Sequence, residues 1–224
     1  MVPALSDGVI VLNGYTDSDI AAHLAGEDEG IARHFGPWPQ ASTEATVRDA
    51  FTRWSHDWKT GGPTRAFAAR ETATGRLLGG CELRLQPDGS AHVSYWTSGG
   101  ERRRGYATRA LALLLQYALS IGVTRLESHV AEDNLASRRV SEKAGFRPAS
   151  KFTANRTGII RYKARLQTSR ARQGSSEAPP KDQVGPGGNG RPTWTSNDMA
   201  RQRTGGREQL AARRPGRAAA PRKP

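Results

Sequence analysis

From about residue 8 to residue 167, apolar and polar positions repeat with the periods of strands and helices. The short apolar run Val9–Leu12 predicts a first strand. The stretch that begins at Thr16 resembles a capping box, which predicts Thr16 as the N-cap of a short helix. Another helix is expected through Ile31, and the Gly36–Pro39 segment should break it.

A longer helix is predicted next, because four large apolar side chains recur at helical spacing and share one face: Val47, Phe51, Trp54 and Trp58. Thr43 can cap the start of this helix, and Gly61-Gly62-Pro63 should end it.

Three strands are then predicted, over residues 65–70, 77–85 and 91–97. Residues 72–75 turn the chain back after the first of them, and Pro87-Asp88-Gly89 forms the hairpin turn after the second. Along the middle strand, Cys81 alternates with apolar leucines, so we expect it in the core and not as a nucleophile.

The remaining pattern predicts a helix over residues 107–120, a strand over 124–130 and a helix from Asn134 to Ala144. Two last strands, from Phe146 onward and over residues 159–166, should form a hairpin. This order of elements predicts a mixed α/β sheet with helices on both faces, in one domain over residues 8–167.

After Leu166 the periodicity disappears, and residues 168–224 are rich in Gly, Pro, Arg and Ser. Too little apolar surface is present to offset the entropy of ordering, so we interpret this segment as a disordered tail. It carries twelve Lys/Arg against four Asp/Glu, and so holds +8 of the net charge of +13. Such a tail can contact nucleic acid weakly through phosphates, or it can have no selected function; Trp194 is its only aromatic residue.

Several classes of protein are disfavoured. No apolar run is long enough to cross a membrane, and the first residues do not resemble a signal peptide. One cysteine allows no intramolecular disulfide and fits a reducing cytoplasm, and the scattered histidines show no zinc-binding spacing, so no metal is expected. Monomer and homodimer both remain open.

Candidate chemistry appears where the third strand of the middle group ends and a helix begins. The loop is basic, with Arg102, Arg104 and Arg109 near a helix N-terminus whose unpaired N–H groups attract phosphates. Gly105 allows the backbone to approach a ligand closely, and Ala107 keeps the next turn small. These residues indicate a cradle for a diphosphate without saying which one.

Three motifs together are more specific. Arg102-x-x-Gly105-x-Ala107, the strand Val93-Ser94-Tyr95-Trp96-Thr97 and the helix Asn134-Leu135-Ala136-Ser137-Arg138-Arg139-Val140-Ser141-Glu142-Lys143-Ala144-Gly145-Phe146 resemble, in order and spacing, the GNAT acetyltransferase superfamily. They are most similar to its ribosomal-protein N-terminal alanine acetyltransferase branch. The resemblance covers residues 8–167 and implies a GNAT-like, mainly antiparallel sheet.

The resemblance also implies roles for the matching positions in binding acetyl-CoA. The backbone around Trp96 and Thr97 would pair with the pantetheine arm, Asn134 would contact that arm, and Ser137 would lie near the sulfur. The pyrophosphate would be held by the backbone amides of Arg102, Arg103, Arg104, Gly105, Tyr106, Ala107 and Thr108. Alternatively, Asn134 is only a helix cap.

Some positions depart from the family pattern. Arg103 and Arg109 stand where relatives often have glycine and glutamate, and His92 and Ser94 stand where many have glutamate and glycine. These replacements leave the identity of the catalytic base open. Phe146 is expected in the core, whereas Arg139 and Lys143 are expected on a solvated helix face.

The resemblance implies direct attack of an amine on the thioester in a ternary complex. A protonated amine cannot attack, so a base is needed, and our candidates are His92 and Glu82 on adjacent strands. Glu82 can instead pair with a nearby arginine, His92 can simply be exposed, and Glu127 and His129 are weaker candidates. Ser137 is the candidate acid, or at least a hydrogen-bond donor, toward the departing thiolate.

The acceptor amine is not identified by any motif. Phe35, Trp38 and Trp54 can line its pocket, although ordinary packing is favoured for Trp54. A protein N-terminus and a small molecule such as an amino acid, polyamine or aminoglycoside both remain open. The alternatives to an enzyme are an inactive acyl-CoA-binding sensor and a ribosome- or nucleic-acid-associated protein that uses the basic tail.

Overall fold

The computed structural model describes residues 1–31, 41–154 and 156–167 of the 224-residue chain. Its elements, in chain order, are β1 (Leu5–Ser6), β2 (Ile10–Asn13), α1 (Asp19–Gly26), α3 (Glu44–Thr60), β3 (Thr64–Glu71), β4 (Leu77–Leu85), β5 (Ala91–Thr97), η1 (Gly99–Glu101), α4 (Tyr106–Ser120), β6 (Arg125–Ala131), α5 (Leu135–Lys143), β7 (Arg147–Ala154) and β8 (Thr157–Arg165). Residues 29–31 are helical, as expected. The predictions for residues 35–39 and for the tail fall outside the described residues.

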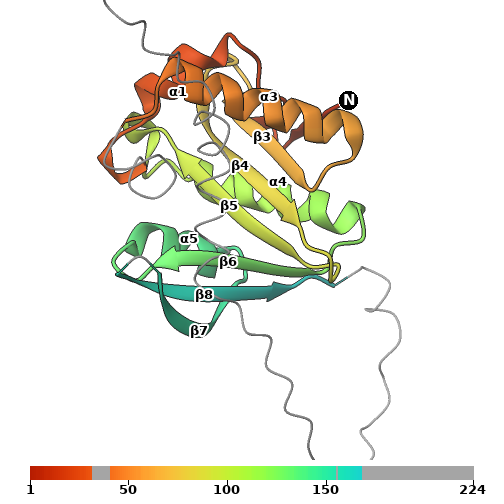
Figure 1. The fold of residues 1–224 in the computed structure, drawn as a ribbon, viewed down its shortest axis with the longest axis vertical. Helices are drawn as coiled ribbons and strands as arrows, with labels where there is room; N and C mark the ends of the chain where they lie inside the picture. Colours follow the sequence, from red (N-terminus) through yellow and green to blue (C-terminus); the bar gives the residue numbers. More distant parts are fainter. Residues whose placement is uncertain (32–40, 155, 168–224) are drawn as a thin grey trace, which may run out of the picture. The chain divides into compact units, whose positions relative to one another are not determined.

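One eight-stranded sheet runs through the described part of the chain in the order β1-β2-β3-β4-β5-β6-β8-β7 (Figure 1). Every neighbouring pair is antiparallel except β5 and β6, which are parallel. Helices α1 and α3 pack on one face, against β4 and β3, while α4 packs on the opposite face beside α5. The predicted fold class, a mixed and mainly antiparallel sheet with helices on both faces, is confirmed.

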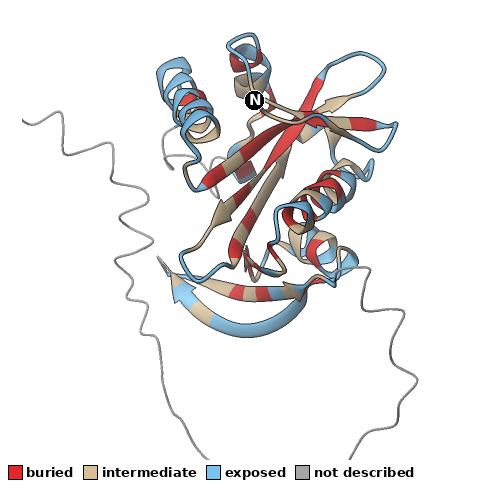
Figure 2. Cartoon of the chain, turned by 90° about the vertical axis from the view of Figure 1, so that its right-hand side faces the viewer, coloured by how far each residue is buried: buried red, intermediate tan, exposed pale blue. Residues whose placement is uncertain are grey.

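Strand alternation decides which face each residue meets. In β4, Leu83 is fully buried in the main core beneath α4, and Cys81 is 4% exposed in the same cluster. Phe146 belongs to this cluster too, as expected. Figure 2 shows buried positions along the strands and on the inner side of α4, with exposed positions on the outer surface of the helices. A smaller cluster joins α1 to α3.

Helix α3 begins and ends as the sequence predicts. The Thr43 hydroxyl accepts a hydrogen bond from the Thr46 N–H at 3.2 Å, and the Thr46 hydroxyl accepts one from the Thr43 N–H at 2.9 Å. The helix ends at Gly61, whose φ of 77° lies in the left-handed region.

The prediction for the first helix was wrong at its start. Helix α1 begins at Asp19 with Ser18 at the N-cap position, and the Thr16 side chain accepts no hydrogen bond from the helix. Half of the capping box does form, because Asp19 Oδ2 accepts from the Thr16 N–H at 2.8 Å. The same carboxylate is bound by Arg70 at 2.6 Å, so a contact with a distant strand fixes the helix start.

Strand β1 was not expected. Leu5 pairs with Leu12 of β2, and both Val2 and Leu5 pack against the main core. The folded part therefore begins before residue 8.

The parallel pair of strands opens into a wedge. Pairing between β5 and β6 stops after Ala91↔Leu126 and His92↔Glu127, although both strands continue. Beyond His92, β5 is hydrogen-bonded within the sheet only to β4, and Figure 1 shows β5 and β6 diverging. A backbone edge is thereby left available at the centre of the sheet.

Candidate functional site

The N-terminus of α4 has the backbone geometry of a ligand cradle. Gly105 is its N-cap, with a φ of 82°, and its carbonyl accepts from the Arg109 N–H at 3.1 Å. The first N–H groups of an α-helix have no partner within it. A Cβ placed on Gly105 would meet no protein atom within 4 Å, so the space in front of this turn is open. The turn can accept an anionic group against its free N–H groups.

Arg103 lies two residues before this cap, at a φ of 64°. Non-glycine residues rarely adopt this left-handed conformation. The position where relatives often carry glycine is thus one that favours glycine here as well. Arg103 therefore carries some backbone strain in this loop.

The arginine side chains around the cradle are bound to the protein itself. Arg102 pairs with Asp28 at 2.7 Å, Arg109 with Asp7 at 2.7 Å, and Arg104 lies 3.3 Å from Glu101. These pairs fix the side chains and offset part of their charge. The backbone N–H groups at the start of α4 are further donors at the turn.

The end of β5 is held by aromatic packing under α1. Trp96 packs against His23 with ring centroids 4.6 Å apart, and its Nε1 donates to the Tyr15 hydroxyl at 3.2 Å. A side chain at Gly80 would clash with that hydroxyl, so Gly80 makes this packing possible. The Trp96 side chain thus has a structural role, while its backbone and that of Thr97 lie at the wedge between β5 and β6.

Helix α5 begins at the other side of the wedge. Asn134 Oδ1 accepts from the Ser137 N–H at 3.0 Å, so Asn134 is an N-cap, as the alternative interpretation held. The Tyr95 hydroxyl lies 2.9 Å from the Ser137 carbonyl oxygen, 2.8 Å from Ser137 Oγ and 3.2 Å from Ser141 Oγ. Burial raises the pKa of Tyr95. Sequence reasoning missed Tyr95, which links β5 to α5 across the wedge.

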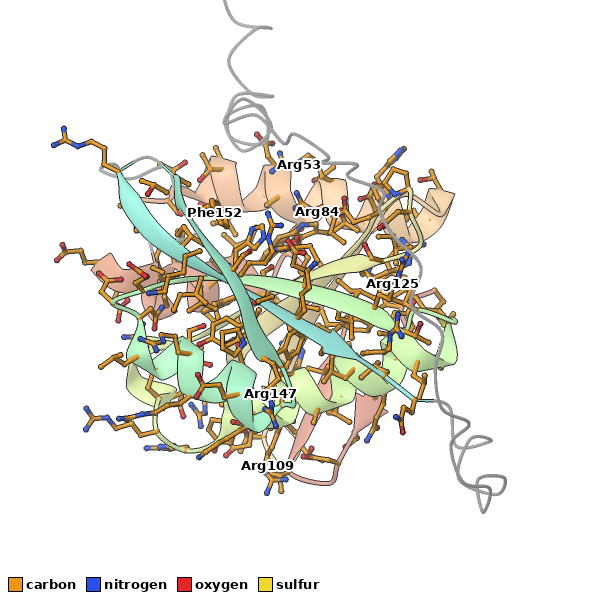
Figure 3. All side chains as sticks on the ribbon, turned by 90° about the horizontal axis from the view of Figure 1, so that it is seen from below. Arg53, Arg84, Arg109, Arg125, Arg147 and Phe152 are labelled. Carbon is orange, nitrogen blue, oxygen red and sulfur yellow. The ribbon has the colours of Figure 1, made fainter. Side chains whose placement is uncertain are left out.

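The opposite face of the sheet carries a row of polar side chains. We define the polar row as the five residues Arg84, His92, Glu127, His129 and Arg161, which come from β4, β5, β6 and β8. Figure 3 shows Arg84 and Phe152 on the side of the sheet that carries α3, whereas Arg109 and Arg147 lie on the side of α4 and α5.

Contacts connect the row from strand to strand. Arg84 lies opposite His92 in the register, and the His92 and His129 rings are 4.7 Å apart. His129 Nε2 donates to Glu127 Oε1 at 2.6 Å, and Arg161 Nε lies 3.1 Å from the same oxygen. Glu82, on the same face, accepts from Arg84 at 2.8 Å, which is the salt bridge considered as its alternative role.

Burial holds His92 neutral at physiological pH. Its pKa is lowered to about 4, first by burial and then by the positive charges of His129 and Arg84. Burial also raises the pKa of the Cys81 thiol, so that this side chain is an inert core residue, as predicted.

The three candidate catalytic residues do not form one cluster. Glu82 and His92 share the α3-side face, two residues apart in the ladder because Glu82 pairs with Ser94. Ser137 lies across the wedge on α5, bound to Tyr95. Sequence reasoning also missed His23, whose Nδ1 is buried without a hydrogen-bond partner beside Trp96. No sequence motif marks His23, and Tyr95 belongs to the strand motif of residues 93–97 without any role being assigned to its hydroxyl.

Other features of the described residues lie apart from this site. A cavity of about 400 Å³ between α5 and the β7–β8 hairpin is lined by residues that include Glu132, Arg138, Lys151 and Tyr162. Its polar groups pair with one another, as in the 2.7 Å ion pair of Lys151 with Glu132. Trp54 packs against Tyr15 and Phe51, which is ordinary packing. None of the described helices is long and apolar enough to cross a membrane.

The fold and site define a mixed α/β protein with a turn that can hold an anionic group, and comparison with known proteins identifies the family. Residues 10–147 match the acetyltransferase (GNAT) domain family. The match spans more than half of the chain, which therefore belongs to this family. The resemblance inferred from the three motifs is confirmed.

Individual relatives are more distant. The uncharacterized N-acetyltransferase YjdG of Bacillus subtilis (strain 168) is 34% identical over 73 residues, which cover 31% of this chain and 44% of that protein. The chain thus aligns with less than half of this curated relative.

Two solved structures share the fold. Ribosomal-protein-S5-alanine acetyltransferase from Vibrio fischeri is 14% identical, with a TM-score of 0.60 over 73% of this chain and 96% of that chain. Spermidine N-acetyltransferase from Vibrio cholerae, solved with CoA and spermine, is 16% identical, with a TM-score of 0.61 over 71% of this chain and 96% of that chain. At these identities the likeness supports the fold and leaves the acceptor open.

Proposed function

We propose that the protein transfers an acetyl group from acetyl-CoA to a primary amine, on a protein N-terminus or a small molecule, by direct attack in a ternary complex. One observation carries this proposal. Strand β5, which borders the wedge, leads through η1 into a helix N-terminus whose Gly105 turn opens onto free space. This combination suits a cosubstrate with an extended amide-containing arm and a pyrophosphate.

The chain's own groups have separable tasks in this proposal. The N–H groups of residues 102–108 hold the pyrophosphate, and ion pairs fix the side chains of Arg102, Arg104 and Arg109 around it. The exposed edge of β5 at Trp96 and Thr97 pairs with the amide arm as an additional strand would. Asn134, whose side-chain oxygen caps α5, still has its amide N–H₂ to donate toward this arm.

The reaction needs one group that accepts a proton from the amine and another that donates a proton to the thiolate. The neutral amine attacks the thioester carbon, a C–N bond forms, and the C–S bond breaks as the amine loses a proton and the thiolate gains one. The Ser137 hydroxyl donates toward the leaving sulfur, and the Tyr95 hydroxyl orients it from across the wedge. Cys81 has no part in this scheme, since its thiol is buried in the core.

His92 and Glu82 divide the role of base unequally. His92 is neutral at pH 7, so its imidazole can accept a proton, although its low pKa makes it a weak base. Glu82 is bound to Arg84 and must share its carboxylate with that arginine. We propose that Glu82 accepts the amine proton through water, and that His92 supports it from the neighbouring strand.

The test is calorimetric titration of the full chain with acetyl-CoA, followed by a thiol-release assay over N-terminal peptides, amino acids, polyamines and aminoglycosides. Binding with turnover on one class of amine supports the proposal and identifies the acceptor class. Binding without turnover on any class favours an acyl-CoA-binding sensor. Absence of binding would contradict both.

A further inference from the structure

The polar row contains buried donors that the protein does not satisfy. Among the described residues, five buried side-chain nitrogen or oxygen atoms have no hydrogen-bond partner, and three of them are Arg84 Nε, His92 Nε2 and Arg161 Nε. Arg161 Nε is 3.1 Å from Glu127, but its N–H does not point at that carboxylate well enough to form a hydrogen bond. Leaving a buried donor unpaired costs about 1–3 kcal/mol, so a cluster of them suggests a missing partner.

All three atoms are nitrogens on one face of three strands. Two of them are guanidinium N–H donors, and a neutral imidazole can carry its proton on Nε2. The nearby carboxylates are already engaged, Glu82 by Arg84 at 2.8 Å and Glu127 by His129 at 2.6 Å. What the row lacks is therefore an acceptor oxygen, and it has little to offer a cationic group.

Resting on the acetyl transfer proposed above, we propose that the polar row binds a carboxylate of the acceptor molecule. Each arginine is already paired with one glutamate, so the two ion pairs carry no net charge. The added anion would be held by the unpaired N–H donors, which suits a single negative charge better than a dianion. Phe152 lies 5.1 Å from the His129 ring and 5.5 Å below the Arg161 guanidinium, which adds an apolar wall beside the anion site.

The spacing along β5 indicates how far this carboxylate stands from the reacting amine. His92 lies three to five residues before the segment Tyr95–Thr97 that borders the wedge, which is about 10–16 Å along a strand. An extended peptide covers this distance in roughly three to five residues. The acceptor inferred here is a peptide with an acidic residue near its third to fifth position, and not a polyamine.

The first experiment compares matched acceptor peptides with the full chain. Peptides that differ only by Asp or Asn at positions two to six are assayed for thiol release at constant ionic strength. We expect kcat/KM to be about tenfold higher for Asp at the third to fifth position, with the gain lost in Arg84→Gln/Arg161→Gln and reduced in Arg84→Lys, which keeps the charge but lacks Nε–H. Arg147→Gln, on the opposite side of the sheet, is the matched control and should keep the gain.

The second experiment does not depend on turnover. The full chain with ¹⁵N-labelled histidine is titrated with propionate, a monocarboxylate, and the imidazole signals of His92 and His129 are followed, with chloride as the reference anion. A saturable shift in the wild type and in Arg147→Gln that disappears in Arg84→Gln/Arg161→Gln supports the site. Imidazole shifts that change linearly with anion concentration in all variants would show that water, and not a carboxylate, occupies the polar row. That result overturns the inference.

The two proposals can fail separately. Loss of acetyl-CoA binding or turnover contradicts the transferase, while the propionate titration still decides whether the row binds a carboxylate. Equal rates for Asp and Asn peptides, or an Asp advantage that survives in Arg84→Gln/Arg161→Gln, would overturn the row as the acceptor's carboxylate site. A check of acetyl-CoA affinity in each variant identifies any that is misfolded.

Discussion

At the scale of single residues, Gly105 offers a direct test of the pyrophosphate cradle. We expect Gly105→Ala to weaken acetyl-CoA binding by at least tenfold, because the new methyl group occupies the open space before the α4 N-terminus. The positive φ of 82° adds backbone strain of about 1 kcal/mol. Calorimetric titration of each variant with acetyl-CoA measures the effect.

Gly122→Ala is the matched control, since Gly122 lies at the other end of the same helix, also has a φ of 82°, and also has no atom within 4 Å of a built Cβ. Both variants should lose similar stability, and only Gly105→Ala should lose affinity. Equal acetyl-CoA affinities in the two variants would show that the pyrophosphate does not bind at this turn.

The lowered pKa of His92 predicts that the folded chain loses stability in acid. Its folded pKa of about 4 lies below the ordinary value of 6.5, so between these pH values the unfolded chain binds a proton that the folded chain does not. Stability is fully present above about pH 6.5 and falls as pH drops toward 4, by about 1–2 kcal/mol at pH 5.

Urea unfolding at pH 7.5 and pH 5 measures this effect. We expect the loss on acidification to be smaller in His92→Gln than in the wild type. His56→Gln, which alters an exposed histidine on α3, should lose as much as the wild type. An unchanged loss in His92→Gln would show that His92 takes up its proton as readily in the folded chain.

The sequence was informative for residues whose neighbours are close in the chain. Gly105, Asn134 and the cradle loop belong to local motifs, and the structure has them at a helix start. Tyr95 was missed because its hydroxyl contacts Ser137, 42 residues away. The unpaired donors of the polar row could not be predicted either, because strand register decides which side chains lie next to one another.

At the scale of elements, the link between β5 and α5 can be cut with one substitution. Tyr95→Phe removes the hydroxyl shared by Ser137 and the fully buried Ser141. We expect a loss of about 1–2 kcal/mol in unfolding free energy, because buried hydroxyls lose a partner. We also expect kcat to fall more than KM changes, because Ser137 loses the contact that orients it.

Tyr117→Phe makes the same change on α4, where the Tyr117 ring packs against Phe67 with centroids 5.3 Å apart. This control should leave kcat unchanged. Urea unfolding and steady-state kinetics on the identified acceptor measure both effects. A fall in stability alone, with kcat preserved, would make Tyr95 a structural link with no part in catalysis.

Most elements were predicted within one or two residues, because hydrophobic period, caps and turn glycines act locally. The failures have physical causes outside the local sequence. Thr16 does not cap α1, because Asp19 is turned toward Arg70, 51 residues away. Strand β1, with two residues, is too short to produce a period.

At the scale of the whole molecule, the order of strands in the sheet could not be predicted from the order of elements along the chain. The sequence predicted a final hairpin, but nothing in it shows that β8 lies beside β6 while β7 forms the edge. The parallel pairing of β5 with β6, on which the wedge depends, is equally a property of the assembled sheet. The motifs supplied this information only through resemblance to a family.

The last described contacts predict that the domain is complete without the tail. The Leu166 N–H donates to the Thr124 carbonyl at 2.8 Å, and the Leu166 side chain packs against the main core. A chain of residues 1–167 should therefore unfold at the same urea concentration as the full chain and bind acetyl-CoA with the same affinity. Loss of either property would show that residues 168–224 support the fold.

The same pair of chains tests the basic tail, whose excess of cations favours contact with phosphates. We expect the full chain to bind single-stranded RNA at 50 mM salt and to release it by 300 mM, while residues 1–167 bind weakly at both. A polar tail with one aromatic residue lacks stacking platforms, so affinity should depend on salt and not on base sequence. Equal RNA binding by the two chains would instead assign the contact to the folded domain, and binding by neither would leave the tail without a nucleic-acid partner.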